Sequence, residues 1–175
     1  DPVTADDFVY AWRRAMLPDT AADYTKLMYT IQGAKDFYNW RAQALADHAE
    51  ASHDDAQAAA DALWQETQER FAQTVALEAV DDRTLRVTLE RPTPYFLELC
   101  AFVTFSPVHR ASHEARSRVD AASGRVVEDT TYWNQPDALV TNGAYTLADR
   151  AFKQGLRLEA NPEYHAADQV KSKTI

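Results

Sequence analysis

The 175-residue sequence can bury one substantial core or two small ones, and its 46% hydrophobic and 26% charged content excludes a disordered chain. A net charge of −9 disfavours nucleic acid and anionic membrane surfaces as partners, because the electrostatic attraction to both has the wrong sign. The sequence has no apolar run approaching the length that spans a bilayer.

The first predicted element is an amphipathic helix over residues 5–16. Thr4 and Asp7 form a capping box, and apolar residues recur at helical spacing on one face, namely Ala5, Phe8, Val9, Trp12, Ala15 and Met16. This spacing places Trp12 in the core. Pro18 ends the helix, and a second helix start follows over residues 19–28, the stretch that contains Tyr24.

Residues 33–73 predict a helical hairpin. The first stripe consists of Ala34, Phe37, Tyr38, Arg41, Leu45 and His48. Ser52 and Asp55 make a second capping box ahead of the second stripe, which consists of Ala56, Ala59, Leu63, Trp64, Gln68 and Phe71. We interpret the hairpin as a solvated helical elaboration of a larger lobe. The alternative is a surface that receives a partner helix.

The pattern changes to period two over residues 75–90, which predicts two strands joined by a turn. The acidic residues Asp81 and Asp82 fit turn chemistry better than a cation site, because aspartate bonds its own backbone. A short helix is expected from Pro92 to about Leu99, and an extended apolar segment over residues 102–108. The single cysteine, Cys100, lies in an apolar run and is expected to be a buried structural thiol.

The next stretch carries histidines and charges but no complete site. His109 and His113 stand at helical spacing, yet no third ligand follows, so no metal site is predicted. Residues 116–136 read as a charged loop anchored by Tyr132 and Trp133. A nucleophile elbow, a phosphate-binding glycine loop and a pair of catalytic carboxylates are all missing from the sequence, so we expect no enzyme.

The last predicted element is a β-hairpin. Asn142 and Gly143 give a turn signal, because both residue types tolerate positive φ. Apolar residues then alternate with polar ones at Tyr145, Leu147, Leu156 and Leu158, and Pro162 after Asn161 stops the second strand. Together these elements predict an α+β fold, with antiparallel strand pairs at 75–90 and 144–160 packed by the helices between 5 and 73.

Three motifs occur in the order in which one family has them: residues 2–14 (PVTADDFVYAWRR), 91–98 (RPTPYFLE), and 140–147 (VTNGAYTL) followed by 155–165 (GLRLEANPEYH). The chain thus resembles the OppA-like oligopeptide-binding proteins of ABC importers, solute-binding protein family 5. The resemblance implies a venus-flytrap fold, with one lobe over residues 1–139, including a helical insert near 40–74. Residues 140–175 would form a hairpin of the neighbouring ligand-binding lobe. It also implies that this sequence is a fragment without its signal segment.

The resemblance further implies non-catalytic binding of oligopeptides for uptake, with Tyr24, Phe102, Asn142 and Gly143 in contact with the substrate. No cofactor or metal is expected. The expected partners are the oligopeptide and a membrane-embedded ABC permease, and the protein would be a monomer, periplasmic or anchored outside the cytoplasm. The second function hypothesis is a helical protein–protein interaction module without a small ligand.

Overall fold

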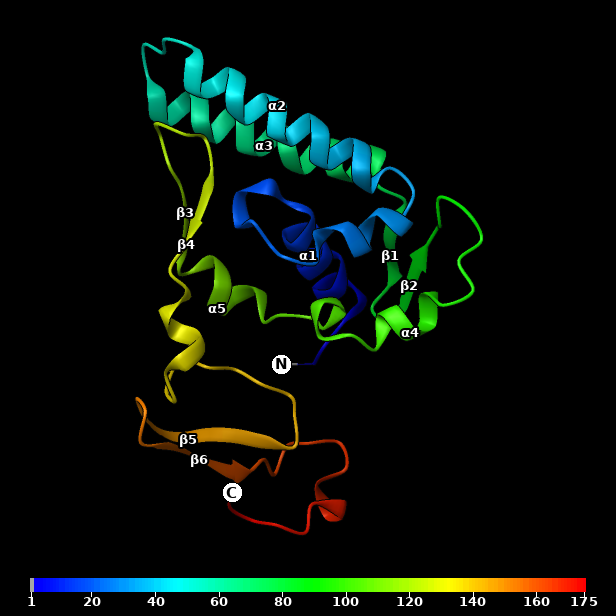
Figure 1. Cartoon of the computed structure of the whole chain (residues 1–175), viewed down its shortest axis with the longest axis vertical. Helices are drawn as coiled ribbons and strands as arrows, with labels where there is room; N and C mark the ends of the chain where they lie inside the picture. Colours follow the sequence, from blue (N-terminus) through cyan, green and yellow to red (C-terminus); the bar gives the residue numbers. More distant parts are fainter. Residues whose placement is uncertain (1) are drawn as a thin grey trace. The chain divides into compact units, whose positions relative to one another are not determined.

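The computed structural model describes residues 2–175 as two compact units, shown in Figure 1. The first unit comprises the residues up to 110 together with 117–128, and it contains α1 (Ala5–Met16), α2 (Ala34–Glu50), α3 (Ala56–Thr74), β1 (Leu77–Asp81), β2 (Thr84–Val87), α4 (Phe96–Cys100), β3 (Ser117–Val119) and β4 (Val126–Glu128). The second unit comprises 111–116 and 129–175, and it contains most of α5 (Arg110–Glu114), β5 (Tyr145–Ala151) and β6 (Gly155–Ala160). The α+β class is confirmed.

Helix α1 lies at the centre of the first unit, and it begins and ends at the predicted residues, 5 and 16. Its capping box is confirmed, since the Asp7 carboxylate accepts a hydrogen bond from the Thr4 backbone N–H at 2.7 Å. The Ala5 N–H, another group left unpaired at a helix start, donates to the Asp82 carbonyl at 2.9 Å. Trp12 is 2% exposed, which confirms its place in the core.

The predicted second helix over residues 19–28 is wrong. Two 3₁₀ turns, η1 (Pro18–Thr20) and η2 (Thr25–Thr30), occupy this stretch instead. Ala21 adopts the left-handed conformation with φ of 46°, and this ends η1. The Asp19 side chain does not cap a helix, because it binds Arg41 in the interior.

The helical hairpin is confirmed, and α2 and α3 lie side by side (Figure 1). Its interpretation as an elaboration of a larger lobe stays a prediction, but the hairpin is not solvated on every face. The rings of Phe37 and Phe71 lie 5.3 Å apart, and both residues belong to the same core as Met16 of α1. The hairpin therefore supplies part of the core. Asp55 is the N-cap of α3, since its carboxylate accepts from the Ala58 N–H at 3.0 Å, so the predicted Ser52 cap is wrong.

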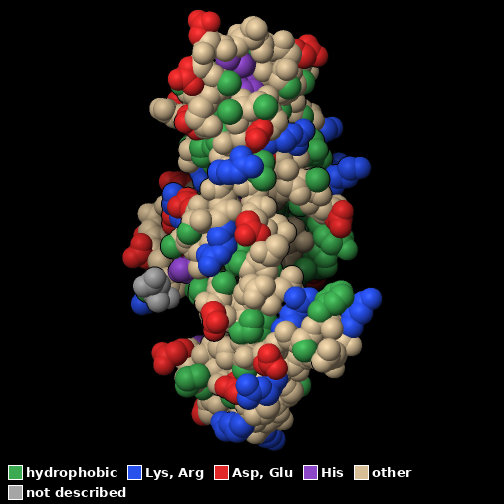
Figure 2. Space-filling view, turned by 90° about the vertical axis from the view of Figure 1, so that its left-hand side faces the viewer, with side chains coloured by type: hydrophobic (Ala, Val, Ile, Leu, Met, Phe, Trp, Pro, Cys, Tyr) green, Lys and Arg blue, Asp and Glu red, His purple; other side chains and the backbone are tan. Residues whose placement is uncertain are grey.

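The free end of this hairpin carries two stacked histidines. The His48 and His53 rings lie 4.3 Å apart, and a His48 ring nitrogen lies 3.1 Å from the Ala121 carbonyl oxygen of the loop between β3 and β4. Figure 2, viewed toward this end, shows histidine side chains among acidic ones. An added Cβ at Gly124 would lie 3.0 Å from the His48 ring, so the absence of a side chain there permits the close approach.

The strand pair β1 and β2 is confirmed. Backbone hydrogen bonds also join the residues next to these strands to Gln32, which precedes α2. The Gln32 N–H donates to the Thr88 carbonyl, and the Ala76 N–H donates to the Gln32 carbonyl, both at 3.0 Å. Gly33 follows with φ of 79°, and an added Cβ would lie 1.9 Å from the Thr74 carbonyl oxygen. Only glycine fits where the start of α2 meets the end of α3.

Three predictions for residues 96–136 are wrong. Cys100 is exposed, because the short helix α4 buries only part of one face. Residues 103–105 form the 3₁₀ turn η3 (Val103–Phe105) in place of an extended segment. The supposed charged loop contains the antiparallel pair of β3 and β4, followed by η4 (Thr130–Asn134). These strands are too short to show period two, and the turn between them is set by the Asp120 carboxylate, which accepts from the Ser123 N–H, and by Gly124 with φ of 65°.

In the second unit, β5 and β6 form the predicted hairpin, with Leu147 opposite Leu158 and a turn over residues 152–154. The second strand ends before Asn161, as predicted. Residues 173–175 add to the free edge of β6, because Leu158 and Ile175 exchange backbone hydrogen bonds at 2.8 and 3.0 Å. Within residues 2–175, no helix has the length and apolar character needed to cross a bilayer.

Truncation of Trp12 tests the core of the first unit. Its ring lies 5.1 Å from the Phe105 ring, edge to face, and its indole N–H donates to the Phe105 carbonyl at 2.8 Å. Trp12→Ala should lower the free energy of unfolding by roughly 3–5 kcal/mol. Chemical denaturation followed by circular dichroism measures this loss. The control Tyr95→Ala removes a ring that is 54% exposed and should change stability by less than about 0.5 kcal/mol. Equal losses for both variants would contradict the buried position of Trp12.

Candidate functional site

Tyr24 lies on the surface of the first unit, in the connection between η1 and η2. Its side chain is 51% exposed. The next residue anchors the connection, since the Thr25 hydroxyl is buried and donates to the Ala15 carbonyl at 2.8 Å and to the Ala22 carbonyl at 2.9 Å. Tyr24 thus stands on a backbone that is fixed immediately after it.

Phe102 follows α4 and is held by backbone bonds on both sides. Its N–H donates to the Leu99 carbonyl at 2.9 Å, and its carbonyl accepts from the Phe105 N–H at 2.9 Å. The Phe105 carbonyl in turn accepts from the Trp12 indole, which ties η3 to α1. The most buried aromatic residue of α1 therefore also fixes the segment that carries Phe102.

The structure brings Tyr24 and Phe102 together. Their ring centroids lie 4.9 Å apart with an interplanar angle of 79°, an edge-to-face contact of the kind that contributes about 0.5–1.5 kcal/mol beyond area burial. The segment around α4 and η3 adds further exposed apolar side chains, namely Tyr95, Leu97 and Val103. This aromatic pair can pack against an apolar group, and it offers no charge.

Asn142 and Gly143 lie in the second unit, before β5. The Thr141 hydroxyl accepts from the Gly143 N–H at 3.0 Å, and the Gly143 carbonyl accepts from the Asn161 side-chain amide at 2.9 Å. Neither Asn142 nor Gly143 has positive φ, so the predicted reason for the turn is wrong. The bend is closed by side chains, those of Thr141 and Asn161.

Asn161 is a structural residue of this bend that sequence reasoning missed. It is 6% exposed, its backbone N–H donates to the Ala144 carbonyl at 2.9 Å, and its side-chain oxygen accepts from the Glu163 N–H at 3.0 Å. The sequence gives only the strand-ending role of the asparagine before Pro162. Pairing with Gly143 depends on the register of β5 and β6, which the sequence does not reveal.

A second missed feature is the buried ion pair of Asp19 and Arg41. The side chains of both residues are 0% exposed, and the Arg41 Nη2 atom lies 2.7 Å from the Asp19 Oδ1 atom. One signal was visible, since an arginine on the buried stripe of a helix requires an anionic or carbonyl partner. Asp19 was assigned to a helix start, so the two residues were not paired.

The described residues give no sign of a metal centre. Within residues 2–175, no group of three or more His, Cys, Asp or Glu side chains is placed to hold an ion. Desolvation raises the pKa of the Cys100 thiol, which favours the neutral form over the nucleophilic thiolate at neutral pH.

Comparison with known proteins identifies relatives along the whole chain. Residues 1–175 match the family described as "Bacterial extracellular solute-binding proteins, family 5 Middle". The oligopeptide-binding protein OppA of Bacillus subtilis (strain 168) is 32% identical over 100% of this chain, which covers 25% of OppA.

Solved structures give the same result for the fold. The substrate-binding domain of an oligopeptide ABC transporter from Bacillus anthracis has a TM-score of 0.71 and 28% identity, with 100% of this chain and 26% of that chain covered. Listeria monocytogenes OppA bound to peptide has a TM-score of 0.70 and 30% identity, with 100% and 27% covered. The chain therefore spans about a quarter of the length of these relatives.

Substitution of Asn161 tests how the bend at Gly143 is held. Asn161→Asp keeps an acceptor for the Glu163 N–H but places a second acceptor against the Gly143 carbonyl. We expect a loss of about 1–3 kcal/mol in the stability of the second unit, the range for an unsatisfied buried group. Amide exchange at Gly143 should be faster. The control Asn39→Asp makes the same charge change on an exposed position of α2, so protection at Gly143 that is equal in the two variants would contradict this role of Asn161.

Proposed function

The chain belongs to the family 5 bacterial extracellular solute-binding proteins, and we propose that it is part of a protein that binds oligopeptides for uptake through an ABC importer. The half-exposed Tyr24 ring, held edge-on to Phe102, carries this proposal. Both residues stand where the resemblance places contacts with bound peptide. The exposed Tyr24 ring and the partly buried Phe102 ring stand on backbone held by hydrogen bonds, which suits a ligand contact because the rings need no reordering on binding.

In this proposal the aromatic pair contacts the side chains of the ligand. An uncharged aromatic surface stabilises apolar parts of a ligand in proportion to the area that they bury against it. Sequence tolerance in such a protein comes from hydrogen bonds to the peptide main chain. We expect residues beyond this chain to supply most of those bonds, together with the charged partners of the peptide termini.

We further propose that residues 1–139 and 140–175 contribute to neighbouring lobes, so that Tyr24 and Phe102 stand on one wall and Asn142 and Gly143 belong to the other lobe. In support, β5 and β6 lie in a different compact unit from α1, α2, α3 and α4. The second unit also contains residues 111–116 and 129–139, so it begins earlier in the chain than residue 140.

The remaining parts of the proposal follow from the family. The protein would act without catalysis, cofactor or metal, because retention and release of a peptide require only reversible contacts. It would work outside the cytoplasm, in the periplasm or anchored to the membrane, as a monomer that delivers its ligand to a membrane permease. Nucleic acid is not among the proposed partners, given the net charge of −9.

The alternative of a helical interaction module is less well supported. The buried stripe of α2 and α3 packs into the core of its own unit. The exposed faces carry side-chain hydrogen bonds between glutamine and a carboxylate one turn later, at Gln43 with Asp47, Gln57 with Asp61, and Gln65 with Glu69. Among the described residues, none of the exposed large hydrophobic side chains lies on α2 or α3.

Calorimetry can test this proposal by comparing the 175-residue chain with the full-length protein. A pool of mixed tripeptides to pentapeptides should release heat with the full-length protein at micromolar concentration and none with the chain alone. Half a binding surface keeps the entropic cost of immobilising the peptide but loses the contacts that offset it. Circular dichroism would first establish that the separate chain is folded. Micromolar binding by the chain alone would place the whole site within it and refute the expectation that residues beyond this chain supply most of the bonds to the peptide.

A further inference from the structure

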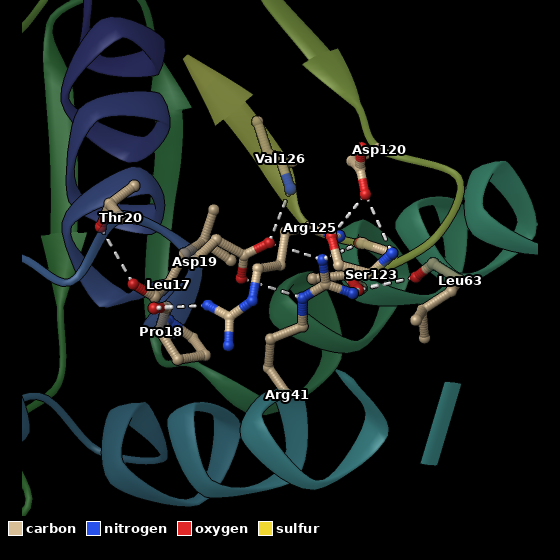
Figure 3. A network of polar contacts seen from close by, with 12 residues as sticks. Leu17, Pro18, Asp19, Thr20, Arg41, Leu63, Asp120, Ser123, Arg125 and Val126 are labelled. Carbon is tan, nitrogen blue, oxygen red and sulfur yellow. Dashed lines mark hydrogen bonds and ion pairs between the residues drawn. The ribbon is translucent and has the colours of Figure 1, made fainter. Parts of the chain in front are cut away.

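The segment 17–24, which ends on Tyr24, is held by the buried carboxylate of Asp19. This carboxylate accepts hydrogen bonds from Arg41 Nη2 at 2.7 Å, from Arg41 Nε at 3.2 Å and from the Val126 N–H at 2.8 Å. Figure 3 shows Arg41 reaching from α2 toward Asp19, with Val126 approaching from β4. Both carboxylate oxygens are therefore engaged, and the arginine binds in the bidentate manner that fixes orientation.

Arg41 connects this segment to two further parts of the unit. Its Nη1 atom donates to the Thr67 hydroxyl on α3 at 3.0 Å, and its Nη2 atom donates to the Gly124 carbonyl at 2.8 Å. The Thr67 hydroxyl donates onward to the Leu63 carbonyl at 2.7 Å. The guanidinium group thus joins η1, α2, α3 and the loop between β3 and β4.

The backbone between Asp19 and Tyr24 contains an unfavourable conformation, which indicates that surrounding contacts hold this segment in place. Ala21 has φ of 46°, a left-handed conformation that is unfavourable for a residue with a Cβ atom. Such a conformation persists where surrounding contacts determine it. Asp19 supplies those contacts on one side of Ala21, and the Thr25 hydroxyl supplies them on the other.

We propose that Asp19 and Arg41 are positioning residues of the ligand site, whose buried ion pair holds segment 17–24 so that Tyr24 lies edge-on to Phe102. The inference rests on the proposed function and deepens it. The helical hairpin, through Arg41, sets which ligand side chains this wall accepts. A fixed aromatic pair favours an aromatic or large apolar side chain at one position of the peptide over a small one.

The test uses the full-length protein after its bound ligands have been removed by unfolding and refolding. The probes are pentaalanine and the set of alanine pentapeptides that each carry one phenylalanine. The preference is the ratio of the Kd of pentaalanine to the lowest Kd among the phenylalanine peptides. For the wild-type protein we expect a preference of about tenfold, which corresponds to about 1.4 kcal/mol.

The variants form a double-mutant cycle of Asp19→Asn and Tyr24→Ala. The amide introduced by Asp19→Asn would retain one acceptor and turn a donor toward the guanidinium group. Segment 17–24 would then no longer be held in one orientation. Each single variant should reduce the preference to less than about threefold, and the double variant should show no further loss. The control Leu45→Ala truncates a buried residue one turn after Arg41 and should lower the melting temperature while keeping the preference.

The outcomes separate the inference from the function on which it rests. Three results would overturn the positioning role alone. They are an unchanged peptide preference in Asp19→Asn, losses of preference by Asp19→Asn and Tyr24→Ala that add independently, and a loss of preference in Leu45→Ala equal to that in Asp19→Asn. Absence of pentapeptide binding by the wild-type protein would overturn the proposed function and the inference together. If Asp19→Asn does not fold, Asp19→Leu combined with Arg41→Met removes both buried charges and should lose the preference in the same way.

Discussion

The buried ion pair of Asp19 and Arg41 is the interaction on which the first unit most depends. It joins η1, α2, α3 and the loop between β3 and β4 by direct hydrogen bonds, and the Val126 N–H of β4 donates to the same carboxylate. Desolvation offsets most of the attraction in such a pair, but removal of one partner leaves a buried charge and costs roughly 3–5 kcal/mol. The pair therefore fixes how the four segments are arranged more than it adds to the free energy of unfolding, because its hydrogen bonds permit only one arrangement of these segments.

The aromatic surface follows from this arrangement. Tyr24 stands on a segment fixed by Asp19 and Thr25, and Phe102 stands on a segment fixed by Trp12. Each ring stands on a backbone held both by nearby residues and by a distant part of the chain, Arg41 on the side of Tyr24 and Trp12 on the side of Phe102. The helical hairpin, which looks like an addition in the sequence, supplies Phe71 to the core and Arg41 to the network, so it is part of the structure that supports the site.

The sequence predicted the elements whose signals are local. The capping box of α1, the stripe of α2, the two longer strand pairs and the strand end at Asn161 were all recognised from spacing and turn chemistry. Features that depend on distant partners were not predicted. The left-handed Ala21 is imposed by contacts at Asp19 and Thr25, and the strands β3 and β4 are too short to show a period. Tyr24 and Phe102 were assigned only by resemblance, and nothing in the sequence shows that they touch.

We propose above all that this chain is part of a protein that binds oligopeptides. The most direct measurement is mass spectrometry of the ligands released from the full-length protein after purification under native conditions. The account predicts peptides of mixed sequence in the wild-type protein and a reduced share of aromatic residues among them in Tyr24→Ala. Release of one non-peptide solute would contradict oligopeptide binding, and release of peptides whose composition is the same in the two proteins would contradict the role of Tyr24.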